Sequence, residues 1–302
     1  MHSGFGLGVA TVLASGFQVA RNGLQRSLMP QTGPWGATLV RFLFGLPFSA
    51  LFAAVVIALT RGARPTFGAP FWLVAGLGAA SQLVATASLL IAMRRAGFAV
   101  GTALQQSSLP LAALIGLIAF HDHLRPLAWV GVAVTTVGLA VLSWPRRRPE
   151  ETTSAARPVT GALFGLASGL AFGFSLNAFR HAGQALEPHH PIYAAVVTVF
   201  VVQAMQSVVL GTILLIAAPR VISAVLASAR HSWLAGLCGS LASTGWFVAL
   251  ALAPAASVRA VGVIEAPMAA FAGHRLFNEK LHARQLIAGA AVAVGVLMTA
   301  IG

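Results

Sequence analysis

Long apolar stretches recur along the whole chain, and short gaps between them carry most of the charged residues. The stretches fall at residues 4–20, 36–60, 69–93, 97–120, 127–144, 160–179, 192–217, 231–252, 256–277 and 284–301. A helix of roughly 20 apolar residues crosses a bilayer core of about 30 Å. Because the stretches lack period-two alternation, they favour helices over a barrel. We therefore predict an all-α integral membrane protein with about ten transmembrane helices.

Composition supports this prediction. Hydrophobic residues make up 58% of the chain and charged residues 8%, with a mean hydropathy of +0.85, whereas charges make up about a quarter of a soluble domain. The net charge of +13 comes from basic residues that lie mostly in the short gaps, where they meet lipid headgroups. We expect the bilayer as a partner and no binding to nucleic acid.

The two halves of the chain resemble each other. Residues 145–158, which read PRRRPEETTSAARP, are typical of a solvated linker. A shift of 157 positions superimposes many identical or similar residues across this linker. The matches are Leu13 on Leu170, Ala14 on Ala171, Gly16 on Gly173, Phe17 on Phe174, Pro110 on Pro267, Gly116 on Gly273, Phe120 on Phe277, Asp122 on Glu279, Leu124 on Leu281 and Gly138 on Gly295. We predict a first repeat at 1–144 and a second at 159–302.

Each predicted repeat contains five spans, which is an odd number. The second repeat therefore enters the membrane from the opposite side, and a pseudo-two-fold axis in the membrane plane relates the two. Many secondary transporters use this architecture for alternating access.

On these residues the chain resembles the ten-span EamA-type members of the drug/metabolite transporter superfamily, over nearly its whole length. The resemblance includes Arg41-Phe42 at the second span, a proline in each fourth span, and an acid with Leu two positions on before each fifth span. The first repeat departs from the pattern, with Asp122 in place of Glu and His121 in place of Gly.

The resemblance implies a transporter of small metabolites, often an exporter, with a central cavity between the repeats. We expect a multi-pass protein of a cell membrane, such as a bacterial inner membrane. The expected partners are a small-molecule substrate and protons as a candidate coupling ion. We expect no cofactor, and a monomer or a homodimer.

Glu265 is the acid that lies near the middle of an apolar stretch. A charge there costs at least about 2.5 kcal/mol and is tolerated mainly in a cavity or beside a partner. One interpretation is a site for a substrate ammonium or a proton, since burial favours the neutral acid. The other is a hydrogen-bonded carboxyl that locks the helices together. The sequence leaves both open.

Two arginines also lie within the stretches. Arg259 is six residues before Glu265, so the two do not stack on one helix face. It is equally suited to binding an anion and to reaching the headgroups. Arg41 lies one or two turns into its span and is a candidate clamp for a substrate carboxylate, although we favour its reaching the headgroups.

Pro110 and Pro267 each remove a helical hydrogen bond and expose a carbonyl, which in transporters often lines the site. The residues before Pro110 are unusually polar: Gln105, Gln106, Ser107 and Ser108. Ser108 is the repeat-mate of Glu265, so we place the substrate between these fourth spans. Interhelical hydrogen bonding is the competing explanation.

Further candidates are polar or aromatic side chains in other spans, each of which also fits a packing role: Gln18, Asn177, Gln203, Gln206, Ser243, Thr244 and Trp246. Glycines recur at 161, 165, 169 and 173, and we predict that this strip packs closely on another helix. His121 and His123 flank Asp122 without the further ligands of a metal site.

The sequence shows no H-E-x-x-H, G-x-S-x-G or phosphate-binding loop. We therefore do not expect an enzyme. A membrane-embedded enzyme acting on lipid-linked substrates, and a lipid flippase or channel of the same fold, remain as alternatives.

The basic residues divide 13 to 4 between the two sides, with Arg21 counted on the side of the linker. The positive-inside rule then places the linker in the cytoplasm and both termini outside. Ten-span relatives are usually assigned the opposite orientation, so the side stays open.

Overall fold

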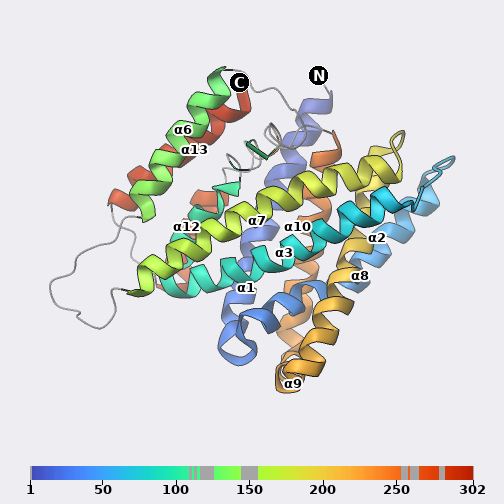
Figure 1. The fold of residues 1–302 in the computed structure, drawn as a ribbon, viewed down its shortest axis with the longest axis horizontal. Helices are drawn as coiled ribbons and strands as arrows, with labels where there is room; N and C mark the ends of the chain where they lie inside the picture. Colours follow the sequence, from blue (N-terminus) through green and yellow to red (C-terminus); the bar gives the residue numbers. More distant parts are fainter. Residues whose placement is uncertain are drawn as a thin grey trace. The chain divides into compact units, whose positions relative to one another are not determined.

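A computed structural model describes residues 2–108, 111, 114–115, 126–143, 156–252, 258, 265–278 and 283–301. The described residues are almost entirely helical (Figure 1). The helices are α1 (His2–Leu43), α2 (Leu46–Leu59), α3 (Ala69–Ala96), α4 (Phe98–Gln105), α6 (Pro126–Ser143), α7 (Ala156–Leu186), α8 (Pro191–Ala217), α9 (Pro219–Ala227), α10 (Ala229–Leu252), α12 (Glu265–Phe277) and α13 (Ala283–Ile301).

The long helix α1 consists of two legs that meet at Gly33. Gly33 has φ 67°, a left-handed conformation that glycine adopts without steric cost. Gln25 Nε2 donates to the Ala37 carbonyl at 2.7 Å, although twelve residues of continuous helix would separate the two by about 18 Å. The chain therefore reverses direction at Gly33.

The first leg is longer than the sequence predicted. The predicted apolar stretch ends at residue 20, and Arg21 and Arg26 are counted among the basic residues in the gap that follows it. The helix instead continues to the turn at Gly33, and Arg21 is 1% exposed. The prediction that Arg21 lies in a gap between spans was therefore wrong. Without Arg21, the basic residues are still divided unequally between the two sides of the membrane.

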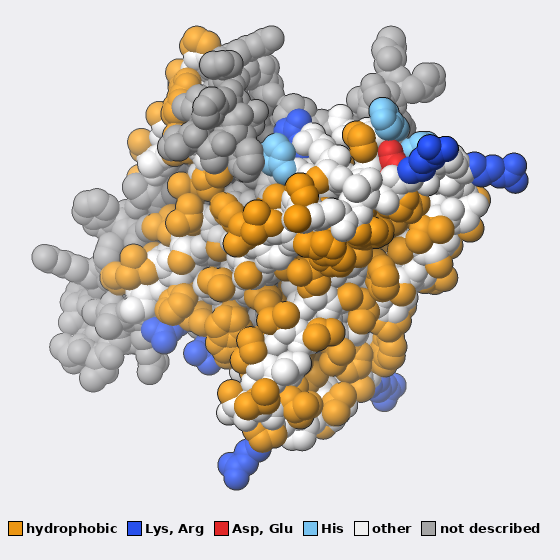
Figure 2. Space-filling view, turned by 45° about the vertical axis from the view of Figure 1, so that its right-hand side comes forward, with side chains coloured by type: hydrophobic (Ala, Val, Ile, Leu, Met, Phe, Trp, Pro, Cys, Tyr) orange, Lys and Arg blue, Asp and Glu red, His pale blue; other side chains and the backbone are white. Residues whose placement is uncertain are grey.

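Five helical segments are long and apolar enough to cross a membrane among the described residues. They are Val12–Leu59, which includes the turn at Gly33, then Ala69–Ala96, Val159–Leu186, Pro191–Ala217 and Ala229–Leu252. Large apolar side chains cover much of the described surface on the face that Figure 2 shows. On α2 and α8, Leu59 and Ile216 are each 78% exposed. An exposed apolar surface of this extent is typical of a protein that faces lipid.

The chain divides into two compact units. Unit 1 contains Met1–Leu83 and Ser175–Pro254, and unit 2 contains Val84–Phe174 and Ala255–Gly302. The boundaries fall inside α3 and α7. Each unit therefore combines residues from both predicted repeats.

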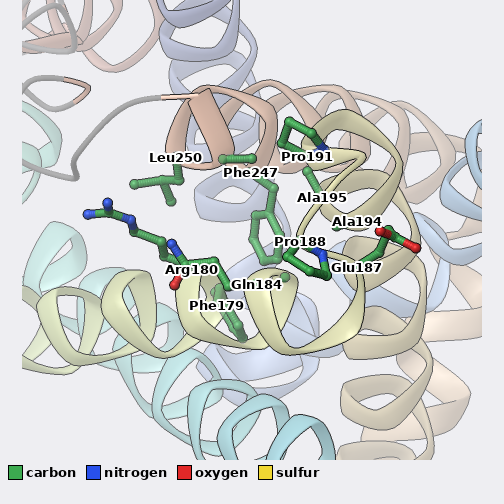
Figure 3. Close-up of a pocket in the computed structure, with 12 residues that line it drawn as sticks. Phe179, Arg180, Gln184, Glu187, Pro188, Pro191, Ala194, Ala195, Phe247 and Leu250 are labelled. Atoms are coloured by element: carbon green, nitrogen blue, oxygen red, sulfur yellow. The ribbon is translucent and has the colours of Figure 1, made fainter. Parts of the chain in front are cut away.

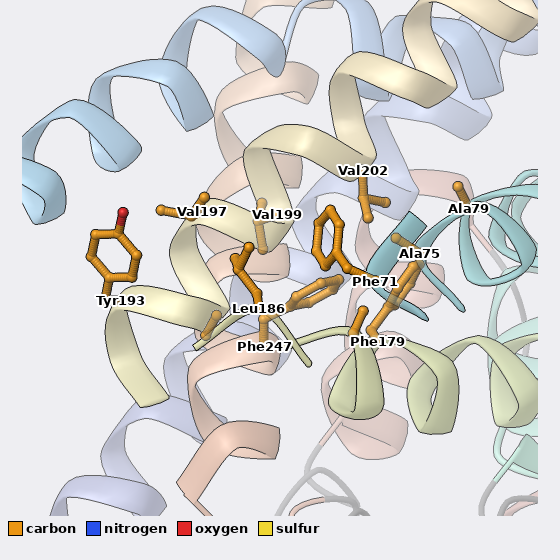
Figure 4. Close-up of a cluster of buried hydrophobic side chains, with 12 residues drawn as sticks. Phe71, Ala75, Ala79, Phe179, Leu186, Tyr193, Val197, Val199, Val202 and Phe247 are labelled. Carbon is orange, nitrogen blue, oxygen red and sulfur yellow. The ribbon is translucent and has the colours of Figure 1, made fainter. Parts of the chain in front are cut away.

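In unit 1, α1 packs along α10, while α2 and α10 both contact α8. Its apolar core lies where α3, α7, α8 and α10 meet, and includes Phe71, Phe179, Tyr193, Val202 and Phe247 (Figure 4). The rings of Phe179 and Phe247 lie 4.7 Å apart. These side chains bury large apolar areas and fix the positions of the four helices.

In unit 2, α6 and α13 pack side by side (Figure 1), and their contacts are reciprocal. A Cβ on Gly138 would lie 3.0 Å from Val292 N and 3.2 Å from the Ala288 carbonyl oxygen. A Cβ on Gly295 would lie 2.5 Å from Thr135 N and 2.7 Å from the Gly131 carbonyl oxygen. Residue numbers rise along one helix as they fall along the other, so the pair is antiparallel.

One short helix was not predicted. The nine residues of α9, Pro219–Ala227, follow α8 directly and pack against α1 and α8. Val225 faces the interior while Arg220 is exposed. The segment is too short and too polar to span a bilayer, which is why the search for long apolar stretches missed it.

Candidate functional site

The polar residues predicted before Pro110 form a buried cluster with Glu265 in unit 2. Glu265 is fully buried, and Gln106 Nε2 donates to its Oε2 at 3.3 Å. The cluster also contains Gln105, Ser107 and Ser108, each at most 3% exposed. Helix α4 packs against α12, which brings these residues together from segments about 160 positions apart.

Two atoms of this cluster have no hydrogen-bond partner among the described residues: Gln105 Oε1 and Ser107 Oγ. An unsatisfied buried polar atom costs about 1–3 kcal/mol, so such atoms are rare unless a ligand or water meets them. The cluster thus combines a carboxyl group with polar atoms that have no hydrogen-bond partner among the described residues. These groups are suited to binding an ammonium group or a proton.

The glycine strip of α7 packs against this cluster, within unit 2. A Cβ on Gly165 would lie 2.6 Å from Leu104 Cβ, and one on Gly169 would collide with Ser107 Oγ. Gly161 likewise lies against Ala96. The predicted close packing is therefore confirmed for these three glycines, and it holds the segment from residue 96 to 108 firmly in place.

Arg41 lies in unit 1 and does not reach the surface. It is 2% exposed, and its Nη2 donates to Ser243 Oγ on α10 at 3.2 Å. Its guanidinium also lies 4.9 Å from the centre of the Phe42 ring. The predicted contact between Arg41 and the lipid headgroups is therefore wrong. No pattern in the sequence indicates that Ser243 on α10 would accept a hydrogen bond from Arg41.

Other candidate residues are buried and hydrogen-bonded within unit 1. Gln206 donates to the Ala79 carbonyl at 3.2 Å and to Gln82 at 2.8 Å, which fits the packing interpretation. Gln203 and Ser240 lie 3.3 Å apart, and Ser240 donates to the Gly45 carbonyl. The exposed fractions of the rest are small: Gln18 5%, Asn177 4%, Ser243 6% and Trp246 5%. Thr244 Oγ1 has no hydrogen-bond partner in the described part of the chain.

Several predictions cannot be placed. Pro110, Arg259, Asp122, His121, His123 and Glu279 lie outside the described residues. Pro267 lies within α12, and its backbone is helical. Among the described residues, no group of three His, Cys, Asp or Glu is placed to hold a metal ion.

A cavity of about 200 Å³ in unit 1 was not predicted. It lies between the C-terminal ends of α7 and α10 and the start of α8. The lining includes Phe179, Arg180, Gln184, Glu187, Pro188, Pro191, Phe247 and Leu250 (Figure 3). Pro188 and Pro191 lie between two apolar stretches and indicate the turn beside the cavity. No pattern in the sequence indicates that α10 packs next to this turn.

Glu187 joins two loops beside this cavity. Its carboxylate accepts hydrogen bonds from the backbone amides of Arg64 at 2.6 Å and His189 at 3.0 Å. The Thr66 amide also donates to the Leu186 carbonyl at 2.8 Å. The amide of Arg64, followed by that of His189, lowers the pKa of Glu187 from its ordinary value. The ionised carboxylate therefore ties the α2–α3 loop to the α7–α8 loop.

This tie predicts a pH-dependent loss of stability. Because the pKa of Glu187 is lower in the folded state, its contribution is complete above the ordinary glutamate pKa of about 4.3. It is lost as the pH falls through the lowered value. We expect Glu187→Gln to lower the melting temperature in detergent at about pH 7, and the gap to wild type to narrow as the pH falls below the ordinary glutamate pKa of about 4.3. A gap that is absent at neutral pH, or that persists in acid, would contradict the role of the carboxylate.

Comparison with known proteins adds evidence on the fold. No family model matches the chain, and no curated protein matches it. A solved structure described as the crystal structure of a protein is similar over 97% of this chain and 96% of the other, with a TM-score of 0.59 and 16% sequence identity. At this identity the likeness shows a shared fold, and the chain is an all-helical protein of membrane character.

Proposed function

We propose that the chain is a secondary transporter of small metabolites, built from two inverted five-span repeats. The observation that carries the proposal is the reciprocity of α6 and α13. Gly138 and Gly295 are repeat-mates, and so are the residues that they contact: Thr135 with Val292, and Gly131 with Ala288. Gly138 contacts Val292, and their repeat-mates Gly295 and Thr135 also contact each other. Contacts that are exchanged in this way are expected where a two-fold axis relates the two helices. The antiparallel direction supports an axis in the membrane plane.

One other helix pair is related by the same offset. A shift of 157 maps α2 onto residues 203–216 of α8, and these helices contact each other within unit 1. Repeat-mates that pack on each other are expected beside a two-fold axis, so this contact also supports the proposed inverted repeats.

We place the substrate or coupling ion at the cluster of Glu265, Gln105, Gln106, Ser107 and Ser108. The carboxylate would bind an ammonium group of an amino-acid-like or drug-like metabolite, or a proton. Neutralising Glu265 in either way removes a buried charge, which lowers the cost of rearranging the helices around it. Alternation between outward-open and inward-open states would then depend on occupancy of this site.

Flux through purified protein in proteoliposomes tests the function. A panel of amino-acid-like and cationic drug-like compounds should yield at least one with saturable uptake, which responds to an imposed pH gradient and shows counterflow. Uptake that never saturates would indicate a channel. Movement of lipid headgroups without solute flux would indicate a flippase, and formation of a new compound would indicate an enzyme. Each of these three results would reject the proposal.

A further inference from the structure

Two buried arginines converge on one face of α10 in unit 1. Arg21 and Arg41 come from the two legs of α1, and they are 1% and 2% exposed. A Cβ added to Gly239 would lie 3.3 Å from Arg21 Cδ and 3.1 Å from Arg41 Cγ. The absence of a side chain at Gly239 therefore leaves room for both arginine chains beside α10.

Both arginines lie far from the turn that joins the two legs. Arg21 is twelve residues before Gly33 and Arg41 eight residues after it, which are about 18 Å and 12 Å along a helix. Each distance is close to half of the roughly 30 Å bilayer core. If the turn marks one membrane surface, the two guanidinium groups lie near the midplane, where charged residues are rare and usually functional.

The positive charge of the two arginines favours an anion at this place, because both buried side chains meet beside Gly239. Two guanidinium groups close together strongly attract a negatively charged group in a medium of low dielectric constant.

The hydrogen-bonding groups are also arranged as donors. Asn22 Oδ1 accepts from both Nε and Nη2 of Arg21, at 3.2 Å and 2.7 Å, which fixes the guanidinium plane. The Asn22 Nδ2 donor is then left without an acceptor in the described residues, although Asn22 is 1% exposed. Arg41 is directed towards α10 by its bond to Ser243. A guanidinium presents paired N–H groups that match the two oxygens of a carboxylate or a phosphate.

We propose that Arg21, Arg41 and Asn22 form a binding site for an anionic oxygen group, a carboxylate or a phosphate. The group belongs either to a small solute or to a lipid headgroup. If it belongs to the transported substrate, the proposal rests on the proposed function and defines the substrate class as anionic or zwitterionic.

Thermal unfolding in lipid nanodiscs tests the site without measuring transport. Wild-type protein in phosphatidylcholine discs is titrated with benzoate, L-aspartate and inorganic phosphate, and with choline chloride as the cationic control. A second set of discs contains phosphatidylglycerol. A rise in melting temperature with a soluble anion indicates a solute site, and a rise with phosphatidylglycerol alone indicates a headgroup site. Ligands that bind the native state produce such rises.

Variants show whether the arginines cause the rise. Arg21→Gln and Arg41→Gln should each weaken the apparent affinity at least about tenfold, the equivalent of one charge-assisted contact. Arg41→Lys keeps the charge, so its apparent affinity for the anion should lie between that of Arg41→Gln and that of wild type. Arg220→Gln, at an exposed position on α9, is the matched control and should change nothing.

The proposal is overturned if no anion raises the melting temperature above the choline control, or if the rise is the same in folded Arg21→Gln and Arg41→Gln protein. Flux of a neutral or cationic compound without any anion effect would leave the transport proposal standing and reject this one. Anion binding without flux of any compound would support this proposal and reject the transport proposal.

Discussion

Glu265→Gln is expected to remove the pH dependence of flux and to lower flux at limiting substrate by at least about tenfold. Glutamine has nearly the same shape as glutamate and retains an oxygen that can accept from Gln106, which donates at 3.3 Å in the wild type. It cannot ionise, so it loses the charge that would bind an ammonium group or exchange a proton. Truncating one partner of a buried charge pair typically costs several kcal/mol.

A shorter acid gives the matched control for this experiment. Glu265→Asp keeps an ionisable group, so it should transport more slowly than wild type but retain the pH dependence. Both variants are compared at equal amounts of folded protein, as judged by gel filtration and thermal unfolding. If Glu265→Gln transports normally at every pH, Glu265 is a packing residue and the coupling role is wrong.

Gly295→Ala is expected to destabilise the protein by about 1–3 kcal/mol, the usual cost of overpacking a closely packed contact. The new Cβ would lie 2.5 Å from both Thr135 N and Thr135 Oγ1, and a backbone nitrogen in a helix cannot move aside alone. Gly138→Ala places the equivalent Cβ 3.0 Å from Val292 N and 2.9 Å from Val292 Cγ2. We therefore expect a smaller loss there, measured as the shift in melting temperature in detergent.

The same helix supplies the control. Gly289 lies on α13, and apart from its chain neighbours and the backbone of its own helix, no described atom lies within 4 Å of the place where its Cβ would be. Gly289→Ala should be neutral or stabilising by up to about 1 kcal/mol, because alanine is the better helix former. Equal effects at positions 289 and 295 would mean that α6 and α13 do not pack closely.

Several of the long helices were predictable from apolar length, because a membrane helix must satisfy its backbone within one continuous segment. The predicted stretch at 192–217 matches α8, Pro191–Ala217, almost residue for residue, and that at 284–301 matches α13. Proline begins α6 and α8 and the short α9, where its missing amide costs nothing. The burial of Glu265 also followed from the sequence, since nothing polar flanks it closely.

Arg21 shows the limit of this reasoning. A charged residue at the end of an apolar stretch is read as the end of a span, and only tertiary packing reveals otherwise. The surroundings of Arg21 come from three segments. Asn22 lies on the first leg of α1, Arg41 on the second leg, and Gly239 on α10. The cavity beside Glu187 was missed for the same reason, because α7, α8 and α10 meet there from distant parts of the chain.

The inverted arrangement of the repeats is most directly tested by membrane topology. A reporter that is active on only one side of the membrane is placed within the linker at 145–158 in one protein and after residue 302 in another. With five spans in each repeat, the two reporters should give opposite signals, and a tag before residue 1 should agree with the one after residue 302. Equal signals from the linker and the C-terminus would mean an even number of spans in the second repeat, and would contradict the two-fold relation between the repeats.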